Sequence, residues 1–393
     1  MKYKENWEET KQKWEKYWKR ENTGRPLMSI IAEKPEAMDA EKAAHLKSVD
    51  VEDKYMNPER IVERFRYFCE THDFLAESFP NLSVDFGPGS MAGYLGSEIV
   101  FDMKTVWFRE FVEDWLDYPD LAFDPENKWF QKHMEVFRRV CELSGGDFYV
   151  GIPDIMENLD VLVSMRGAQD TIFDMMDEPE ELLRRVNQVQ DLYFTYYDAF
   201  YDLAKQMENG KESSCYTVFQ IWGEGKIAKL QCDFSAMISP DQFREFVQEA
   251  LRGQAKQLNH SLYHLDGPDA IRHLDAIMEI EEIDALQWTS GDYGPDGTFE
   301  EWYPIYDKAV AAGKALWVKV YSGETEEWLE RLDKLVARYG SSALFLYFGP
   351  VSRENADKIL AHAEKYWSDV EGSFTRECRK RDSRRVCWKR ERI

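Results

Sequence analysis

The chain has 393 residues, 44% of them hydrophobic, which is enough apolar material for one large barrel or for several domains. Its formal charge is −24, and the last 21 residues hold nine of the 50 basic and three of the 74 acidic residues, so residues 1–372 carry a charge of −30. Such a body repels nucleic acids and anionic membranes, no apolar run approaches the ~20 residues of a membrane span, and the N-terminus is charged throughout; we therefore expect a cytoplasmic protein without nucleic-acid or membrane partners.

Aromatic residues mark a helix at the N-terminus. Tyr3, Trp7, Trp14 and Trp18 recur at helical spacing and share one stripe. We expect residues 1–24 to form an amphipathic helix that packs on the main body through this stripe.

Strand-like apolar runs alternate with helix patterns over residues 25–370. Signals such as Ser239-Pro240 and Glu178-Pro179 begin the helices. The eight apolar runs are Leu27 to Ala32, Leu82 to Phe86, Phe148 to Pro153, Tyr216 to Trp222, Ser261 to Leu265, Asp284 to Trp288, Ala315 to Tyr321 and Ala343 to Phe348. Eight strands alternating with helices predict an α/β fold of the (β/α)8 TIM-barrel type, with a doubly wound open sheet as the alternative.

Two further segments interrupt or follow this pattern. Residues 87–147 contain two helix patterns, and we expect a helical insertion that covers the carboxyl face of the barrel. Residues 371–393 have no apolar periodicity and reverse the charge of the body, which favours an extension without fixed structure over a functional basic arm.

Polar and aromatic residues gather where the predicted strands end, which is where barrel active sites are built. They are Asp85, Asp154, Trp222, Glu224, His264, Asp266, Trp288, Tyr321 and Tyr347. Asp85 either binds substrate or caps a loop, and the aromatic residues either belong to the core or form the walls of a pocket for a flat ligand.

His264 and Asp266 are the most informative pair in this group. Side chains two residues apart in a strand point to the same face, so the imidazole and the carboxylate lie together. The pair can bind a metal, act as a general acid and base, or be structural. Cys232 would complete a sulfur, nitrogen and oxygen set of the kind found in catalytic zinc sites, although buried free cysteines are also common as small apolar residues. Glu224 and Asp233 are alternative oxygen ligands.

Several stretches resemble the uroporphyrinogen decarboxylase superfamily, which includes corrinoid- and cobalamin-dependent methyltransferases. They span about residues 25–368. The stretches are R-P-L-M at 25–28, G-I-P-D at 151–154, D-V-L-V-S-M-R-G-A-Q-D at 160–170, D-E-P-E-E-L at 177–182, M-I-S-P-D-Q-F-R-E-F-V at 237–247, Y-H-L-D-G at 263–267 and L-Y-F-G-P at 346–350. The resemblance implies a (β/α)8 barrel.

The two branches of this superfamily differ in the sequence motifs that they carry. The decarboxylases carry an R-Q-A-G-R stretch after the first strand, where this chain reads A-E-K-P-E at 32–36, and their late G-H-G is replaced by Phe348-Gly349-Pro350. The methyltransferases carry a zinc site written H-x-C on the fifth strand with a later cysteine. Here His264 matches the histidine, Asp266 stands at the cysteine, and no cysteine lies between 232 and 378.

We therefore expect a methyltransferase that moves a methyl group from a small methoxylated or methylated donor to a corrinoid. The chain has no D-x-H-x-x-G motif, so the corrinoid is expected on a separate partner protein, with zinc as a further candidate cofactor and a homodimer as a candidate assembly. In this reading His264, Asp266 and Asp85 carry the chemistry, while Cys232, His264 and Asp266 are the candidate metal ligands. The alternatives are a carboxy-lyase acting on a tetrapyrrole, in which Asp85 stabilises the protonated intermediate, and a barrel that only binds a corrinoid or tetrapyrrole.

Overall fold

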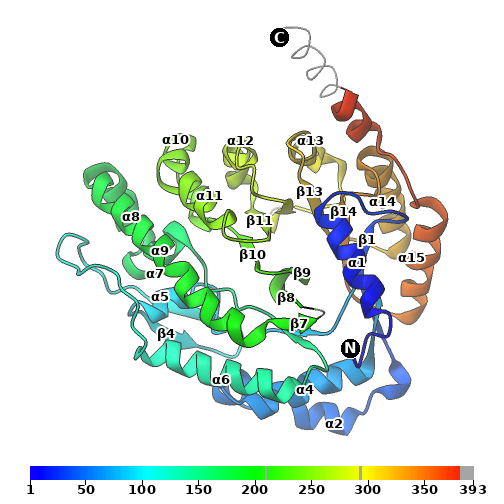
Figure 1. Ribbon diagram of the computed structural model, residues 1–393, viewed down its shortest axis with the longest axis horizontal. Helices are drawn as coiled ribbons and strands as arrows, with labels where there is room; N and C mark the ends of the chain where they lie inside the picture. The colour runs from blue at the N-terminus through cyan, green and yellow to red at the C-terminus, as the bar shows by residue number, and fades with distance from the viewer. Residues whose placement is uncertain (209, 292–293, 381–393) are drawn as a thin grey trace. The chain divides into compact units, whose positions relative to one another are not determined.

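The computed structural model describes residues 1–208, 210–291 and 294–380, and the chain divides into two compact units. Residues 1–5, 34–72 and 80–263 form the first unit, and residues 6–33, 73–79 and the chain from 264 onward form the second. Each unit contains both helices and strands (Figure 1), so the fold is mixed α/β.

The first unit contains most of the helices that begin before residue 260. Its helices are α2 (Ala40–Leu46), α3 (Val51–Tyr55), α4 (Pro58–Thr71), α5 (Ser90–Tyr94), α6 (Lys128–Ser144), α7 (Asn158–Arg166), α8 (Ala168–Asp177), α9 (Pro179–Ala204), α10 (Pro240–Phe243) and α11 (Glu249–Ala255). Its strands are β3 (Asn81–Leu82), β4 (Glu98–Phe101), β5 (Val106–Arg109), β6 (Tyr149–Val150), β7 (Gln206–Glu208), β8 (Lys211–Tyr216), β9 (Ile221–Glu224) and β10 (Ile227–Leu230). Helices α6 and α9 lie side by side (Figure 1), with the rings of Phe137 and Phe200 5.1 Å apart.

The second unit begins with the predicted N-terminal helix. This helix, α1 (Trp7–Trp18), is shorter than predicted and does not include Tyr3, but it buries the three tryptophans of the predicted stripe. Trp14 lies 4.9 Å from the ring of Phe345, and the Tyr17 hydroxyl donates to the carbonyl of Leu316. Strands β1 (Leu27–Glu33), β2 (His72–Ala76), β12 (Ala285–Thr289), β13 (Ala315–Val320) and β14 (Leu344–Val351) alternate with helices α12 (Leu274–Met278), α13 (Tyr303–Ala311), α14 (Thr325–Tyr339) and α15 (Arg353–Tyr366).

A seven-stranded, mostly parallel sheet has the order β10-β11-β12-β13-β14-β1-β2, where β11 spans His260–Asp266. Residues 260–263 of β11 pair with β10 inside the first unit, and β12, β13, β14 and β1 pair in parallel inside the second. Strands β3 and β6 form a separate parallel pair. This pairing supports the α/β class; a closed eight-stranded barrel stays a prediction.

Five of the eight predicted strands are confirmed, two are much shorter than expected, and one is wrong. The first and the last four are confirmed as β1, β11, β12, β13 and β14, but those expected at Leu82 to Phe86 and Phe148 to Pro153 shrink to the two-residue strands β3 and β6. The strand expected at Tyr216 to Trp222 is wrong: the run is a tight turn, with Gln220 at a φ of 49°, between the antiparallel strands β8 and β9.

The remaining segments also differ in detail from the expectation. The insertion at 87–147 holds the helices α5 and α6, but between them lies an antiparallel β4–β5 hairpin that the sequence pattern did not indicate. In the C-terminal stretch, residues 373–380 are helical, and residues 381–393 lie outside the described part of the chain.

Candidate functional site

The two acids predicted after the second and third strands lie on neighbouring loops of the first unit. Asp85 follows β3 and Asp154 follows β6, and because these strands are a parallel pair, both loops leave the same edge. The β4–β5 hairpin packs on the turn after Asp85, where Gly87 has a φ of 91° and a Cβ would lie 2.7 Å from Cβ of Val106. The insertion therefore packs against the loop that carries Asp85.

A buried lysine completes this edge of the first unit. Lys229 lies in β10 with no exposed surface, and its Nζ is 2.9 Å from Oδ1 of Asp154. Burial alone would lower the pKa of Lys229, but the charges of Asp154 and Glu157 outweigh that effect and raise it, so the side chain is an ammonium ion. The ammonium carries three N–H donors, more than its contact with Asp154 uses.

Two carboxyl groups beside this lysine hold protons near neutral pH. Burial, followed by the charge of Asp154, raises the pKa of Asp85 to about 7, and Oδ1 of Asp85 is a buried atom that accepts no hydrogen bond from the described residues. Burial raises the pKa of Glu157 to about 8, against the opposing charge of Lys229. Oε1 of Glu157 accepts a hydrogen bond of 2.6 Å from the backbone N–H of Gln231. Groups with such pKa values can give or take a proton at neutral pH.

Cys232 faces a carboxylate in the first unit. Its Sγ lies 3.8 Å from Oδ1 of Asp160, whose oxygens also accept hydrogen bonds from the backbone N–H groups of Asp233 and Phe234 at 2.8 and 2.9 Å. Burial and then the charge of Asp160 raise the pKa of the Cys232 thiol. A zinc ligand must be a thiolate, so these surroundings disfavour the metal role predicted for Cys232.

His264 and Asp266 share one face of β11, as their spacing predicts. His264 Nε2 and Asp266 Oδ2 are 4.0 Å apart, with 16% and 43% of the two side chains exposed. Nδ1 of His264 is hydrogen-bonded to Oε1 of Gln287, and because an amide oxygen only accepts, Nδ1 carries the proton. In the neutral tautomer that this hydrogen bond selects, Nε2 is the lone-pair nitrogen, the kind of atom that can bind a metal or take a proton.

Aromatic residues of the second unit divide between the two faces of the sheet. Tyr347 stacks on Trp317 at 5.1 Å and 19°, and Trp317 pairs in register with Gln287, on the same face as His264. Tyr321 is 48% exposed just beyond β13. Trp288 follows Gln287 directly, so it points to the opposite face, where it is buried 5.1 Å from the ring of Trp302. Trp288 therefore does not share the face of His264.

Trp222 and Glu224 lie on the β8–β9 hairpin, and the predicted metal ligands are divided between the two units. Trp222 is buried in β9, and the carboxylate of Glu224 is paired with Lys211 Nζ at 2.6 Å. Cys232 belongs to the first unit, whereas His264 and Asp266 belong to the second. The joint metal set of these three residues therefore stays a prediction.

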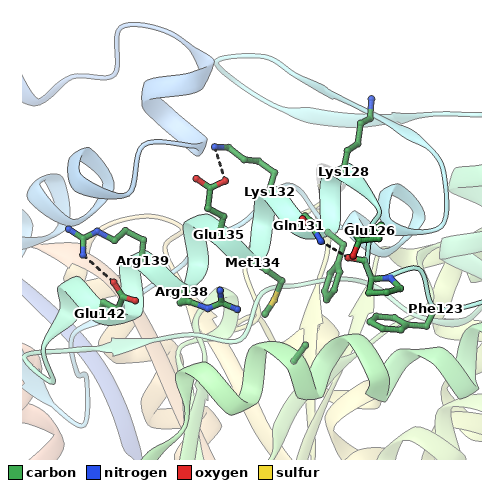
Figure 2. Close-up of a pocket in the computed structure, with 13 residues that line it drawn as sticks. Phe123, Glu126, Lys128, Gln131, Lys132, Met134, Glu135, Arg138, Arg139 and Glu142 are labelled. Atoms are coloured by element: carbon green, nitrogen blue, oxygen red, sulfur yellow. Dashed lines mark hydrogen bonds and ion pairs between the residues drawn. The ribbon is translucent and has the colours of Figure 1, made fainter.

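A groove of about 830 Å³ runs along the outer face of α6 (Figure 2). Most of its charged side chains neutralise one another: Lys132 pairs with Glu135 at 3.4 Å, and Arg139 pairs with Glu142 at 3.1 Å. These ion pairs therefore cancel much of the charge along the groove.

Comparison with known proteins adds no further constraint. No model of a known protein family and no curated protein sequence matches the chain. Among the described helices, none combines the length and the apolar character that crossing a membrane requires.

Proposed function

We propose that the protein is a corrinoid-dependent methyltransferase of the uroporphyrinogen decarboxylase superfamily, built on a closed (β/α)8 barrel. The donor is a small methoxylated compound, and the acceptor is a corrinoid held by a separate partner protein. The observation that carries the proposal is the buried group of Asp85, Asp154 and Lys229 in the first unit, in which a protonated carboxyl lies near a fixed ion pair.

Methyl transfer from an ether needs a proton at the oxygen that departs. The bond between the methyl carbon and that oxygen breaks, its electron pair stays on the oxygen, and an unprotonated alkoxide or phenolate leaves poorly. With a pKa of about 7, Asp85 carries its proton in about half of the molecules at neutral pH and can donate it there, and Lys229 then stabilises the carboxylate that forms. A cobalt(I) corrinoid, when supplied by the partner protein, provides the nucleophile that receives the methyl group.

The residues of the second unit fit a divalent metal better than Cys232 does. His264 supplies an imidazole and Asp266 a carboxyl group on the same face of β11. A metal held there would polarise a donor oxygen as a Lewis acid. The same two residues can also act without a metal, with His264 as base or acid and Asp266 orienting it.

A methylation assay tests this proposal directly. The protein is mixed with a reduced corrinoid protein and a panel of methoxylated aromatics and methylamines, and formation of methylcobalt is followed by absorbance. We expect turnover with at least one methyl ether, a loss of roughly 100-fold or more in Asp85→Asn and His264→Ala, and no change in the surface variant Glu135→Gln. Absence of methyl transfer from every donor, or full activity of both site variants, would overturn the proposal.

A carboxy-lyase is the second candidate, because an acid with the pKa of Asp85 could equally protonate a carbon that has lost CO2. Among the described residues, Lys229 is the cation that acts on the pKa of Asp85, however, whereas a tetrapyrrole substrate presents many carboxylates. Incubation with uroporphyrinogen distinguishes the two functions: appearance of coproporphyrinogen supports the carboxy-lyase, and its absence together with methyl transfer supports the methyltransferase.

A further inference from the structure

His133 lies behind the loop that carries Asp85. It is on the inner face of α6 and has no exposed surface. Its Nε2 is 3.0 Å from the carbonyl oxygen of Val84, and its ring stacks on that of Phe86 at 4.1 Å and 7°. One imidazole therefore holds the residues on both sides of Asp85.

The protonation of this imidazole follows from its partners. A carbonyl oxygen only accepts, so Nε2 must carry a proton, and burial lowers the pKa of His133 to about 4, so the ring is neutral and Nδ1 is an acceptor. The hydroxyl of Tyr94 is 2.7 Å from Nδ1, nearer than its other neighbour Ser90 Oγ at 3.2 Å. Tyr94 therefore donates to His133 and fixes the tautomer that donates to Val84.

We infer that His133 is a positioning residue for Asp85, with Tyr94 holding His133 in the required tautomer. The assignment of Asp85 as the proton donor rests on the function proposed above, but the positioning itself does not. The charged groups that act on Asp85 include Asp154 and Lys229, with the Tyr94 hydroxyl nearby, whereas His133 contacts the backbone itself, at the carbonyl of Val84.

A positioning role for His133 predicts a change in the titration of Asp85, which ordinary core packing does not predict. Without the bond to Val84 and the stack on Phe86, the Asp85 loop can shift toward water, and the carboxyl becomes more acidic. His133→Leu should therefore lower the titration midpoint of Asp85 by about half a unit or more. The turnover number should fall roughly 10-fold with a smaller change in KM, because the substitution displaces the proton donor and leaves substrate binding largely intact.

The titration is measured on the intact protein by carbon-13 NMR of labelled aspartate, with Asp85→Asn assigning the signal. Val140→Ala, another fully buried position of α6, is the matched control: it should lower stability without moving the Asp85 signal. His133→Gln retains a side-chain N–H donor and should shift the signal less than His133→Leu. Tyr94→Phe is a second, milder route to the same shift if His133→Leu does not fold.

The two proposals fail in different ways. If no methyl donor is turned over by the wild-type protein, the proposed function is lost, yet the NMR titration still decides the role of His133. An Asp85 midpoint that is the same in wild type, His133→Leu and Tyr94→Phe would overturn the positioning role, whatever the activity.

Discussion

Lys229 Nζ lies 2.9 Å from Asp154 Oδ1, and both side chains are nearly closed to water. This ion pair is the charged centre of a group of acids that includes Asp85, Glu157 and Asp160, all of whose pKa values respond to Lys229. One lysine cannot neutralise several buried carboxyls, so some must hold protons. Burial is the largest cause of the raised pKa values at this edge of the first unit, and the excess of acid over base adds to it.

Replacing Lys229 by an uncharged residue should lower the stability of the protein, because the buried carboxylates then have no cation beside them. We expect Lys229→Met to cost about 3–5 kcal/mol of unfolding free energy at pH 8, because it leaves Asp154 buried without a counter-charge. The cost should shrink at pH 5.5, where the carboxyls are protonated more readily. Urea unfolding at the two pH values measures it, with the exposed Lys211→Met as control. An equal loss at both pH values would contradict the charge argument and leave only lost packing.

Removing one of the excess acids should have the opposite effect. The pKa of Glu157 is about 8 when folded and 4.5 as its ordinary value, so the folded protein holds this proton more tightly than the unfolded chain. Its contribution to stability is therefore fully present below about pH 4 and is lost as the pH rises through 8. We expect Glu157→Gln, which keeps an acceptor for Gln231, to stabilise the protein by on the order of 1–3 kcal/mol at pH 8.5 and to change little at pH 4.5.

Thermal or urea unfolding across this pH range checks the sign. Glu135→Gln, on the exposed face of α6, should leave the pH profile unchanged. A Glu157→Gln variant that is less stable at pH 8.5 than at pH 4.5, relative to wild type, would show that the carboxylate of Glu157 is stabilised when folded, contrary to the expectation.

Local patterns were sufficient for the strands and side chains whose signal lies within a few residues. The apolar runs around β11 to β14 are bounded by helix signals, and the alternation of strand faces placed His264 and Asp266 together. The turn between β8 and β9 escaped prediction because its residues are as apolar as a strand. Strand β10 escaped because the polar Lys229 interrupts a four-residue run, and nothing in that run indicates a buried charge.

The partners of the site are remote in sequence, which is why they were missed. Lys229 meets Asp154 across 75 positions, and His133 reaches Val84 across 49. Glu157 and Asp160 look like ordinary residues at the beginning of a helix, where acids are common. Only the fold brings them beside Lys229, and no spacing rule in a single sequence records that contact.

Arg166 and Arg185 illustrate conspicuous residues with a structural role. Arg166 lies in the D-V-L-V-S-M-R-G-A-Q-D stretch at 160–170, and it binds Asp174 at 2.9 Å and the carbonyl of Val112. Arg185 is 1% exposed and donates to the carbonyls of Trp115, Tyr118 and Pro119 at 2.6–2.7 Å. Both arginines fasten the loop that precedes α6 to the helices of the first unit.

The contribution of the buried Arg185 to stability can therefore be tested at this loop. Arg185→Met should cost about 3–5 kcal/mol, because several carbonyls lose a charged donor and Glu181 loses a buried partner. The neighbouring Arg184 makes exposed ion pairs, and Arg184→Met should cost less than about 1 kcal/mol. Limited proteolysis should cut residues 110–121 faster in Arg185→Met alone. Equal cleavage of the two variants would remove the fastening role.

The zinc content of two variants distinguishes whether His264 or Cys232 is a metal ligand. Because Cys232 faces Asp160 and its thiol holds its proton, we expect zinc bound to protein purified without chelator to be the same in Cys232→Ser as in wild type. His264→Ala should lose at least about 10-fold in zinc affinity, since it removes the one nitrogen ligand of the pair. His362→Ala is the control, because His362 also lies beside a carboxylate, that of Asp333 at 2.7 Å, away from the candidate site. Loss of zinc in Cys232→Ser, measured by elemental analysis, would restore the thiolate as a ligand and require that Asp160 be displaced from it when the metal binds.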